Sequence, residues 1–224
     1  MSKRAIPITP WRAVSQWKPS PVNFLILTFG LYIFGTGEAF FVESGLGNGP
    51  WTVLAQGISN YLPLTLGWAT FILSALVLLI WIPFRQKPGV GTVMNSITIA
   101  FALGVGINIV PQPKNPFIQI SFCLFGLLLI GLGSALYLSC GLGPGPRDGL
   151  MTAIHLRWNM SIPIVRTSIE LTVLLCGFLL GGNLGFGTLI FALGIGWSLG
   201  LWLFIDRKST RLNSSHTDIS RMPS

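Results

Sequence analysis

FGTGEAFFVESGLGNGPWTVLAQGI, at residues 34–58, and IGLGSALYLSCGLGPGPRDGLMTAI, at residues 130–154, are two versions of one sequence. Aligned without a gap, they match glycines, prolines and small residues at one constant separation, as between Gly35 and Gly131 (131 − 35 = 96). The same separation of 96 returns downstream, where GVGT at 89–92 corresponds to GFGT at 185–188. The chain is therefore a duplicated unit.

The composition places this unit in a membrane. Charged residues make up 9% of the 224 residues and apolar residues 51%, whereas soluble domains carry about 25% charged residues. So few charges cannot cover the surface of a soluble fold, but a lipid bilayer removes that requirement. The net charge of +8 comes mainly from the two ends of the chain and forms no continuous basic face, so nucleic acid is not an expected partner.

Six segments are apolar over about the 20 residues that a helix needs to cross the hydrocarbon layer. They lie at residues 22–42, 64–84, 90–110, 117–138, 162–181 and 186–205. Two shorter segments, at 51–62 and 147–158, follow Gly-Pro pairs, which favour the start of a helix. With about 12 residues each, or roughly 18 Å of helix, they are too short to cross. We therefore predict an all-α membrane bundle of six transmembrane helices, with one short non-spanning helix in each half.

The distribution of basic residues predicts how these spans are oriented. With the N-terminus in the cytoplasm, eleven basic residues up to Lys208 are cytoplasmic and only Lys114 lies outside, as the positive-inside rule requires. Each half then holds three spans, and because three is odd, the second half enters the membrane from the opposite side. The prediction is two inverted repeats with both termini cytoplasmic, an architecture found in many secondary transporters.

The predicted organisation has four parts. These are a cytoplasmic N-terminal segment at 1–20, a first membrane repeat at 21–115, a second at 116–207 and a polar tail at 208–224. The tail from Ser209, STRLNSSHTDISRMPS, has no apolar period. One interpretation is a disordered cytoplasmic tail. The favoured one is a non-native peptide of the kind produced when a reading frame runs into cloning or adapter DNA.

Ionisable residues inside apolar segments are costly, so each is a candidate site for substrate or coupling. Glu38 lies towards the outer end of the first span. It is either a cation or proton site near the outer face or a carboxylate that accepts hydrogen bonds from a neighbouring helix. Arg166 and Glu170 are four residues apart on the fifth span and share one helix face. We expect a structural ion pair, the alternative being a pair that gates or couples a substrate.

Arg147 and Asp148 follow the second Gly-Pro pair, at the start of a predicted short helix. An acidic residue in the first turn complements the helix dipole. Free N–H groups beside an arginine suit an anion, such as a small substrate or a lipid headgroup. The favoured interpretation is simpler: Asp148 caps the helix, and Arg147 marks the cytoplasmic side. The first copy has Trp51 and Thr52 at these positions, so a charged site would be confined to one copy.

The motifs of enzymes and cofactor sites are absent from the sequence. GLGPGPRDG lacks the Gly-Lys-Ser/Thr ending of a phosphate-binding loop, and no strand precedes it as in a dinucleotide-binding fold. The spacing of the three cysteines matches no metal motif. We therefore expect no catalysis, no cofactor and no bound metal.

The two glycine-rich loops, each followed by a span and then G-x-G-T, resemble those of the YczE/YyaS/YitT group of bacterial integral membrane proteins, and YczE most closely. The resemblance extends from about residue 21 to residue 207. It implies a multi-span protein of the bacterial plasma membrane with no assigned activity, and it supplies no site residues.

Two classes of function stay open. A small permease or transporter, of a small solute or anion, is favoured by the repeats, the glycine breaks and the buried carboxylates. A non-transporting scaffold or regulator of a membrane-associated partner is favoured by the scarcity of ionisable residues. The sequence names no protein partner; the lipid bilayer is the expected surrounding.

Overall fold

The computed structural model describes residue 9 and residues 11–219, with side chains described up to residue 205. All regular secondary structure in these residues is helical, so the predicted all-α class is confirmed. The first half contains α1 (Pro21–Glu43), α2 (Pro50–Tyr61), α3 (Leu66–Trp81) and α4 (Val90–Ile109). The second half contains α5 (Pro116–Ser139), α6 (Pro146–Trp158), α7 (Ile162–Leu179) and α8 (Phe186–Ile219).

The two glycine-rich loops fold alike. Gly45 and Gly47 have φ angles of 70° and 107°, and Gly141 and Gly143 have φ angles of 67° and 116°. These left-handed conformations are strained for residues that carry a Cβ atom, which explains the glycines. Each loop ends in a proline within the first turn of a short helix, so the short helices predicted after the Gly-Pro pairs are confirmed as α2 and α6.

Five helices are long and apolar enough to cross a membrane: α1, α4, α5, α7 and the Phe186–Ile205 part of α8. The span predicted at 64–84 is shorter than expected, because Thr65 caps α3 and the chain turns at Pro83. With 16 residues, α3 is about 24 Å long and falls short of the hydrocarbon thickness of about 30 Å. It forms a sixth candidate span only together with α2, which meets it at 113°.

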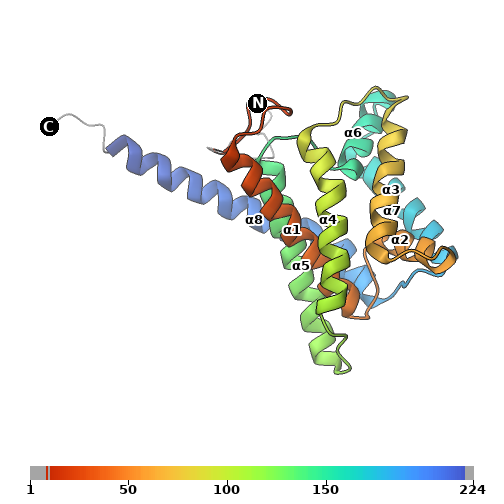
Figure 1. Cartoon of the computed structure of the whole chain (residues 1–224). Coiled ribbons are helices and arrows are strands. Elements are labelled where there is room, and N and C mark those ends of the chain that lie inside the picture. Colours follow the sequence, from red (N-terminus) through yellow and green to blue (C-terminus); the bar gives the residue numbers. More distant parts are fainter. Residues whose placement is uncertain (1–8, 10, 220–224) are drawn as a thin grey trace.

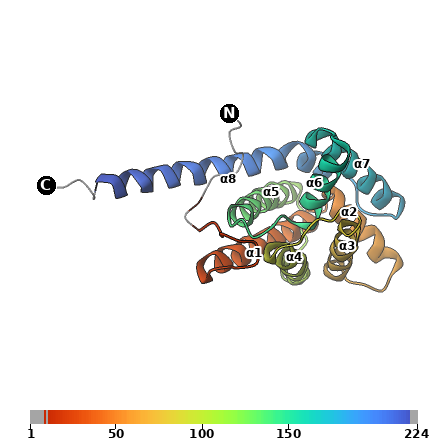
Figure 2. The same cartoon turned by 90° about the horizontal axis from the view of Figure 1, so that it is seen from above.

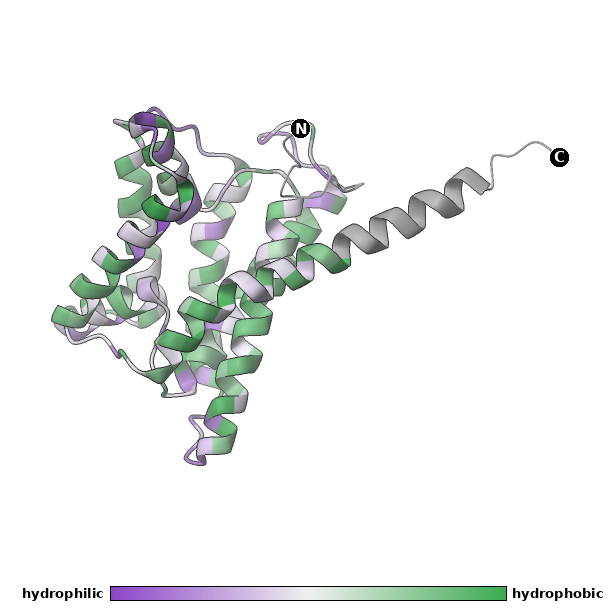
Figure 3. Cartoon of the chain, turned by 180° about the vertical axis from the view of Figure 1, so that it is seen from behind, coloured by the Kyte–Doolittle hydropathy of each residue, from purple (hydrophilic) through white to green (hydrophobic). Residues whose placement is uncertain are grey.

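Large apolar side chains cover the outside of the molecule. Figure 3 shows hydrophobic residues along the middle of the helices and hydrophilic residues gathered at the helix ends and loops. Leu79, Phe101 and Phe178 are among those more than half exposed. Water would disfavour such a surface, whereas lipid accepts it, so the structure supports a position in a membrane.

Helices α1 and α5 cross at the centre of the molecule (Figure 1). A Cβ atom at Gly133 would lie 2.5 Å from the carbonyl oxygen of Gly30, and one at Gly126 would lie 2.6 Å from that of Gly37. Only glycine allows this approach, as is common between membrane helices. The two contacts are reciprocal, since Gly126 and Gly133 are the equivalents of Gly30 and Gly37 at the separation of 96.

The other helix contacts recur in the same reciprocal way. Helix α4 packs on α1, and its equivalent α8 packs on α5, so that α8, α5, α1 and α4 lie side by side (Figure 2). Each short helix packs on a helix of the opposite half, α2 on α7 and α6 on α3. Gly177 of α7 lies against Val53 and Leu54 of α2, and Gly149 of α6 lies against Trp81 of α3. The two halves are therefore intertwined.

The glycine-rich loops also bind the opposite half. The N–H of Gly187, at the start of α8, donates to the carbonyl of Leu46 over 2.7 Å. The N–H of Gly91, at the start of α4, donates to the carbonyl of Leu142 over 2.8 Å. Each repeated loop is thus held by the repeated G-x-G-T of the other copy.

The largest helix contact that is not repeated among the described residues joins α3 and α4. Helix α3 packs along α4, where a Cβ atom at Gly67 would lie 2.8 Å from the carbonyl oxygen of Ala100. The equivalent helices α7 and α8 do not pack in this way. Gly196 and Gly200, which correspond to Ala100 and Gly104, have open space on the side where a Cβ atom would point.

The backbone of α8 continues without a break from the last span through the polar tail to Ile219. This extension leads away from the bundle (Figure 1). The two interpretations of the tail, a disordered segment or a non-native peptide, stay predictions. Residues 220–224, and residues 1–8 of the predicted N-terminal segment, lie outside the described residues.

Candidate functional site

A cavity of about 140 Å³ lies between the two halves, and all eight helices contribute to its wall. Twelve of its lining residues form six pairs at the separation of 96. The pairs are Phe34 and Ile130, Trp51 and Arg147, Thr70 and Arg166, Ser74 and Glu170, Asn95 and Phe191, and Ile99 and Ile195. The cavity is therefore built from equivalent positions of the two copies.

The two copies supply different chemistry to this wall. The first copy contributes neutral groups, among them the hydroxyls of Thr70 and Ser74 on α3. At the equivalent positions of α7, the second copy contributes Arg166 and Glu170. The hydroxyl of Thr70 is buried and has no hydrogen-bond partner in the described part of the chain, so it is free to bond to a molecule in the cavity.

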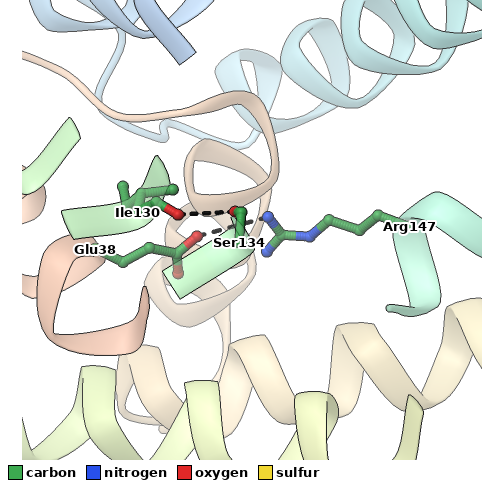
Figure 4. A network of polar contacts seen from close by, with 4 residues as sticks. All are labelled: Glu38, Ile130, Ser134 and Arg147. Atoms are coloured by element: carbon green, nitrogen blue, oxygen red, sulfur yellow. Dashed lines mark hydrogen bonds and ion pairs between the residues drawn. The ribbon is translucent and has the colours of Figure 1, made fainter. Parts of the chain in front are cut away.

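An ion pair joins the two copies beside the cavity. The Nη1 atom of Arg147 lies 3.5 Å from Oε1 of Glu38, whose side chain is 4% exposed. Figure 4 shows Arg147 extending from α6 towards Glu38 of α1, past Ser134 of α5. The guanidinium of Arg147 also lies 5.2 Å from the centre of the ring of Trp51, the residue that corresponds to Arg147 in the first copy. This distance is within the range of a cation–π interaction.

The interpretation of Arg147 as a charge that only marks the cytoplasmic side is therefore wrong. The first turn of α6 points the side chain into the bundle, where the carboxylate of Glu38 compensates its charge. Without Arg147, ten cytoplasmic basic residues still stand against one, so the predicted orientation does not depend on it. Glu38 meets an arginine of the opposite copy, a partner that its place in the sequence did not indicate.

The remaining predicted residues line the cavity as well. Asp148 lies in the first turn of α6, but the prediction that it caps the helix is wrong, because Gly145 is the N-cap and no side chain bonds there. Its carboxylate instead accepts a hydrogen bond from the hydroxyl of Tyr137. Arg166 and Glu170 form the expected pair, with Nε and Oε1 2.9 Å apart. All five candidates thus gather at one site: four line the cavity, and Glu38 pairs with one of the four.

The neutral half of the wall was missed by the sequence analysis. Thr70 and Ser74 are ordinary residues in an apolar helix, and nothing marks them locally. The duplication was the signal that could have identified them, because the separation of 96 aligns Thr70 with Arg166 and Ser74 with Glu170. In a duplicated membrane protein, the equivalent of a charged span residue is itself a candidate.

A protein-family model matches residues 22–203, and its description is "Family of unknown function (DUF6198)". The chain belongs to this family. No solved structure matches it.

Among curated relatives, an "Uncharacterized protein" of Haemophilus influenzae is 48% identical over 193 residues, covering 86% of this chain and 88% of the relative. The "Uncharacterized membrane protein YczE" of Bacillus subtilis is 32% identical over 181 residues, covering 80% and 81%. The "Uncharacterized protein YyaS" of the same organism is 29% identical over 177 residues, covering 75% and 86%. The resemblance to YczE and YyaS is confirmed.

Proposed function

We propose that this DUF6198 protein is a small permease, in which a small polar solute passes through the central cavity of a bacterial plasma membrane protein without chemical conversion. The observation that carries the proposal is the cavity wall. It contains six pairs of equivalent residues from the two copies, and four of its lining side chains are charged. In secondary transporters, the substrate site commonly lies at the interface between two repeats. A charged wall inside a membrane is costly, which favours a functional role for it.

We also propose that the two copies are inverted repeats related by a pseudo-two-fold axis in the membrane plane, with both termini cytoplasmic. The reciprocal contacts of Gly30 with Gly133 and of Gly37 with Gly126 support a two-fold relation, because such an axis pairs residue i with j and j with i. The axis would lie in the membrane plane because the distribution of basic residues predicts that the two halves enter the membrane from opposite sides.

The size of the cavity limits the solute. A volume of about 140 Å³ holds several molecules of water, since one molecule needs about 10–15 Å³ of such space. A solute of a few non-hydrogen atoms therefore fits without rearrangement. Hydroxyls on one side and two ion pairs on the other suit a polar solute, and the site can exchange these pairs for bonds to it.

The experiment that tests the permease uses a single cysteine at Ser134, which lines the cavity. The native Cys123, Cys140 and Cys176 are first replaced. A membrane-impermeant thiol reagent is then applied to right-side-out and inside-out vesicles. We expect labelling from at least one side and none of a control cysteine at Leu103, which is fully buried away from the cavity. If Ser134→Cys reacts from neither side but reacts after denaturation, the cavity is sealed and the permease proposal fails.

A second candidate function is a scaffold or regulator that binds a partner in the membrane. It is favoured by the exposure of α7 and α8. Only 11% of the residues in the apolar stretch of each of these helices are buried, against 44% for α1 and 50% for α4 and α5. A partner helix could cover these faces. Replacing Trp197 of α8, which is 84% exposed, by alanine would then abolish co-purification of the partner and leave the labelling of Ser134→Cys unchanged.

A further inference from the structure

A second void lies next to the central cavity. It measures about 10 Å³ and lies at the start of α2. Its polar lining residues are Glu38 of α1, Asn48 of the first glycine-rich loop and Thr52 of α2. Ile130 and Phe191 line both spaces and separate them. A space of this size holds one molecule of water or one ion of similar size.

Two of the residues that line this void each carry an oxygen atom without a hydrogen bond. Oε2 of Glu38 and Oδ1 of Asn48 are buried, and neither has a partner in the described part of the chain. The two residues are 4% and 1% exposed. Most buried polar atoms in proteins have a partner, so two buried acceptors without one, on residues around a single void, indicate a bound group that supplies a hydrogen-bond donor or a positive charge.

The orientation of the Asn48 amide is fixed by its neighbours. The backbone N–H of Asn183 donates to Oε1 of Gln56 over 2.8 Å, which identifies this atom as an oxygen. Nδ2 of Asn48 donates to the same atom over 3.0 Å. Because the donor side of Asn48 must face Gln56, its Oδ1 is left without a donor at the void.

From this geometry we propose that the void binds one small monovalent cation of the size of sodium, with Glu38 and Asn48 as ligands and Thr52 as a third oxygen. Carboxylate, amide and hydroxyl oxygens are the ligands of hard cations. A monovalent cation fits better than a divalent one, because the site has a single carboxylate, that of Glu38, and this carboxylate already pairs with Arg147. The positive end of α2 lies beside the void and weakens the binding, so the ion can be released.

The charges around the cavity agree with a bound cation. Three carboxylates, those of Glu38, Asp148 and Glu170, stand against the two guanidinium groups of Arg147 and Arg166. A cation at Oε2 would also weaken the hold of Glu38 on Arg147, which lines the cavity. Arg147 would then be free to bind the solute, so the cation would couple to transport. This coupling rests on the proposed permease, whereas the binding of the cation does not.

Cation binding is tested on the purified full chain in detergent by thermal unfolding, with sodium chloride exchanged for choline chloride at constant ionic strength and pH. We expect sodium, at a hundredfold excess over its dissociation constant, to raise the unfolding midpoint by about 5 °C. Binding of ²²Na⁺ should saturate at one ion per chain. If neither ion binding nor a sodium-dependent shift is found, the void holds water and the proposal is overturned. A response to pH alone would make Glu38 a proton site and would overturn it equally.

Variants locate the ion. Glu38→Gln removes the charge and offers an amide N–H to Asn48, so the sodium response should be lost. Thr52→Val keeps the side-chain shape, removes one oxygen and should weaken sodium binding about tenfold. The matched control is Glu43→Gln, the same change five residues along α1 and away from the void, and it should keep the full response. A sodium response that persists in both Glu38→Gln and Thr52→Val would place the ion elsewhere. Sodium binding without labelling of Ser134→Cys would refute the permease alone.

Discussion

The pair α3–α4 and the pair α7–α8 are copies in sequence but differ in packing. Gly67 lets α3 rest on α4, and the groove over that contact does not reach Thr70 or Ser74. At the place of Gly67, α7 has Pro163, and the groove of about 720 Å³ between α7 and α8 reaches Arg166 and Glu170. These two residues also line the cavity. Among the described residues, the groove of about 600 Å³ at α3 and α4 shares no lining residue with the cavity, whereas the groove at α7 and α8 does. We call the first pair closed and the second pair open towards the cavity.

The largest effect is expected from a side chain at the closed contact. Gly67→Leu should destabilise the protein by about 3 kcal/mol, because even its Cβ atom would meet the carbonyl oxygen of Ala100. The matched change in the open pair, Gly196→Leu, should alter the stability by no more than about 0.5 kcal/mol. Membrane level and thermal unfolding measure both. Equal losses in the two variants would show that α7 and α8 are packed in the membrane.

The ion pair in the open groove should give the next largest effect. A lone charge at the centre of a membrane helix costs about 2.5–3.5 kcal/mol. Arg166 is 45% exposed in the groove, so Arg166→Ala or Glu170→Ala should cost less, about 1–2 kcal/mol, and lower the membrane level.

Joint replacement of the pair by leucine should restore much of that level, because no unpaired charge remains. Single variants that accumulate normally would show that water solvates the groove. A double variant that accumulates normally but has lost transport would assign the pair a functional role.

A cross-link tests whether the open pair can close. Pro163 and Gly200 correspond to Gly67 and Gly104, whose atoms approach closely in the first copy. With the native cysteines replaced, the proposed permease predicts that Pro163→Cys with Gly200→Cys forms a disulfide in part of the population on oxidation, because repeats of transporters alternate between two arrangements. The control pairs Pro163→Cys with Leu189→Cys, about 16 Å away along α8. Failure of the first pair to cross-link would mean that the two copies differ permanently.

The smallest effect concerns the extension of α8, which α4 lacks because it ends at Ile109. The residues after Lys208 add no apolar periodicity. Deletion of 209–224 should leave membrane level and the unfolding midpoint unchanged. A marked loss of either would show that the extension is part of the native fold.

The sequence was sufficient for the existence of the eight helices, the loops and the duplication, because each depends on local patterns such as Gly-Pro starts and apolar runs. It overestimated the length of α3, which does not cross by itself. It did not predict the pairing of Glu38 with Arg147, since these residues belong to different copies and meet only where the copies cross. Only the structure shows that Arg147 also contacts Trp51, the residue that corresponds to it in the first copy. The different packing of α7 and α8 left one trace in the sequence, the change from Gly67 to Pro163.

The exchange of short helices between the halves has a consequence for biogenesis. When α2 leaves the ribosome, its partner surface on α7 has not been synthesised, and Gly177 follows Leu54 by 123 residues (177 − 54 = 123). At about 5–20 residues per second, this is a delay of roughly 6–25 s. During that interval, α2 can pack on α3, which is synthesised directly after it, but the surface that will contact α7 stays uncovered and is left to lipid or to the insertion machinery. A half-chain expressed alone would keep that helix exposed to membrane proteases, and supplying the other half as a separate chain should rescue it.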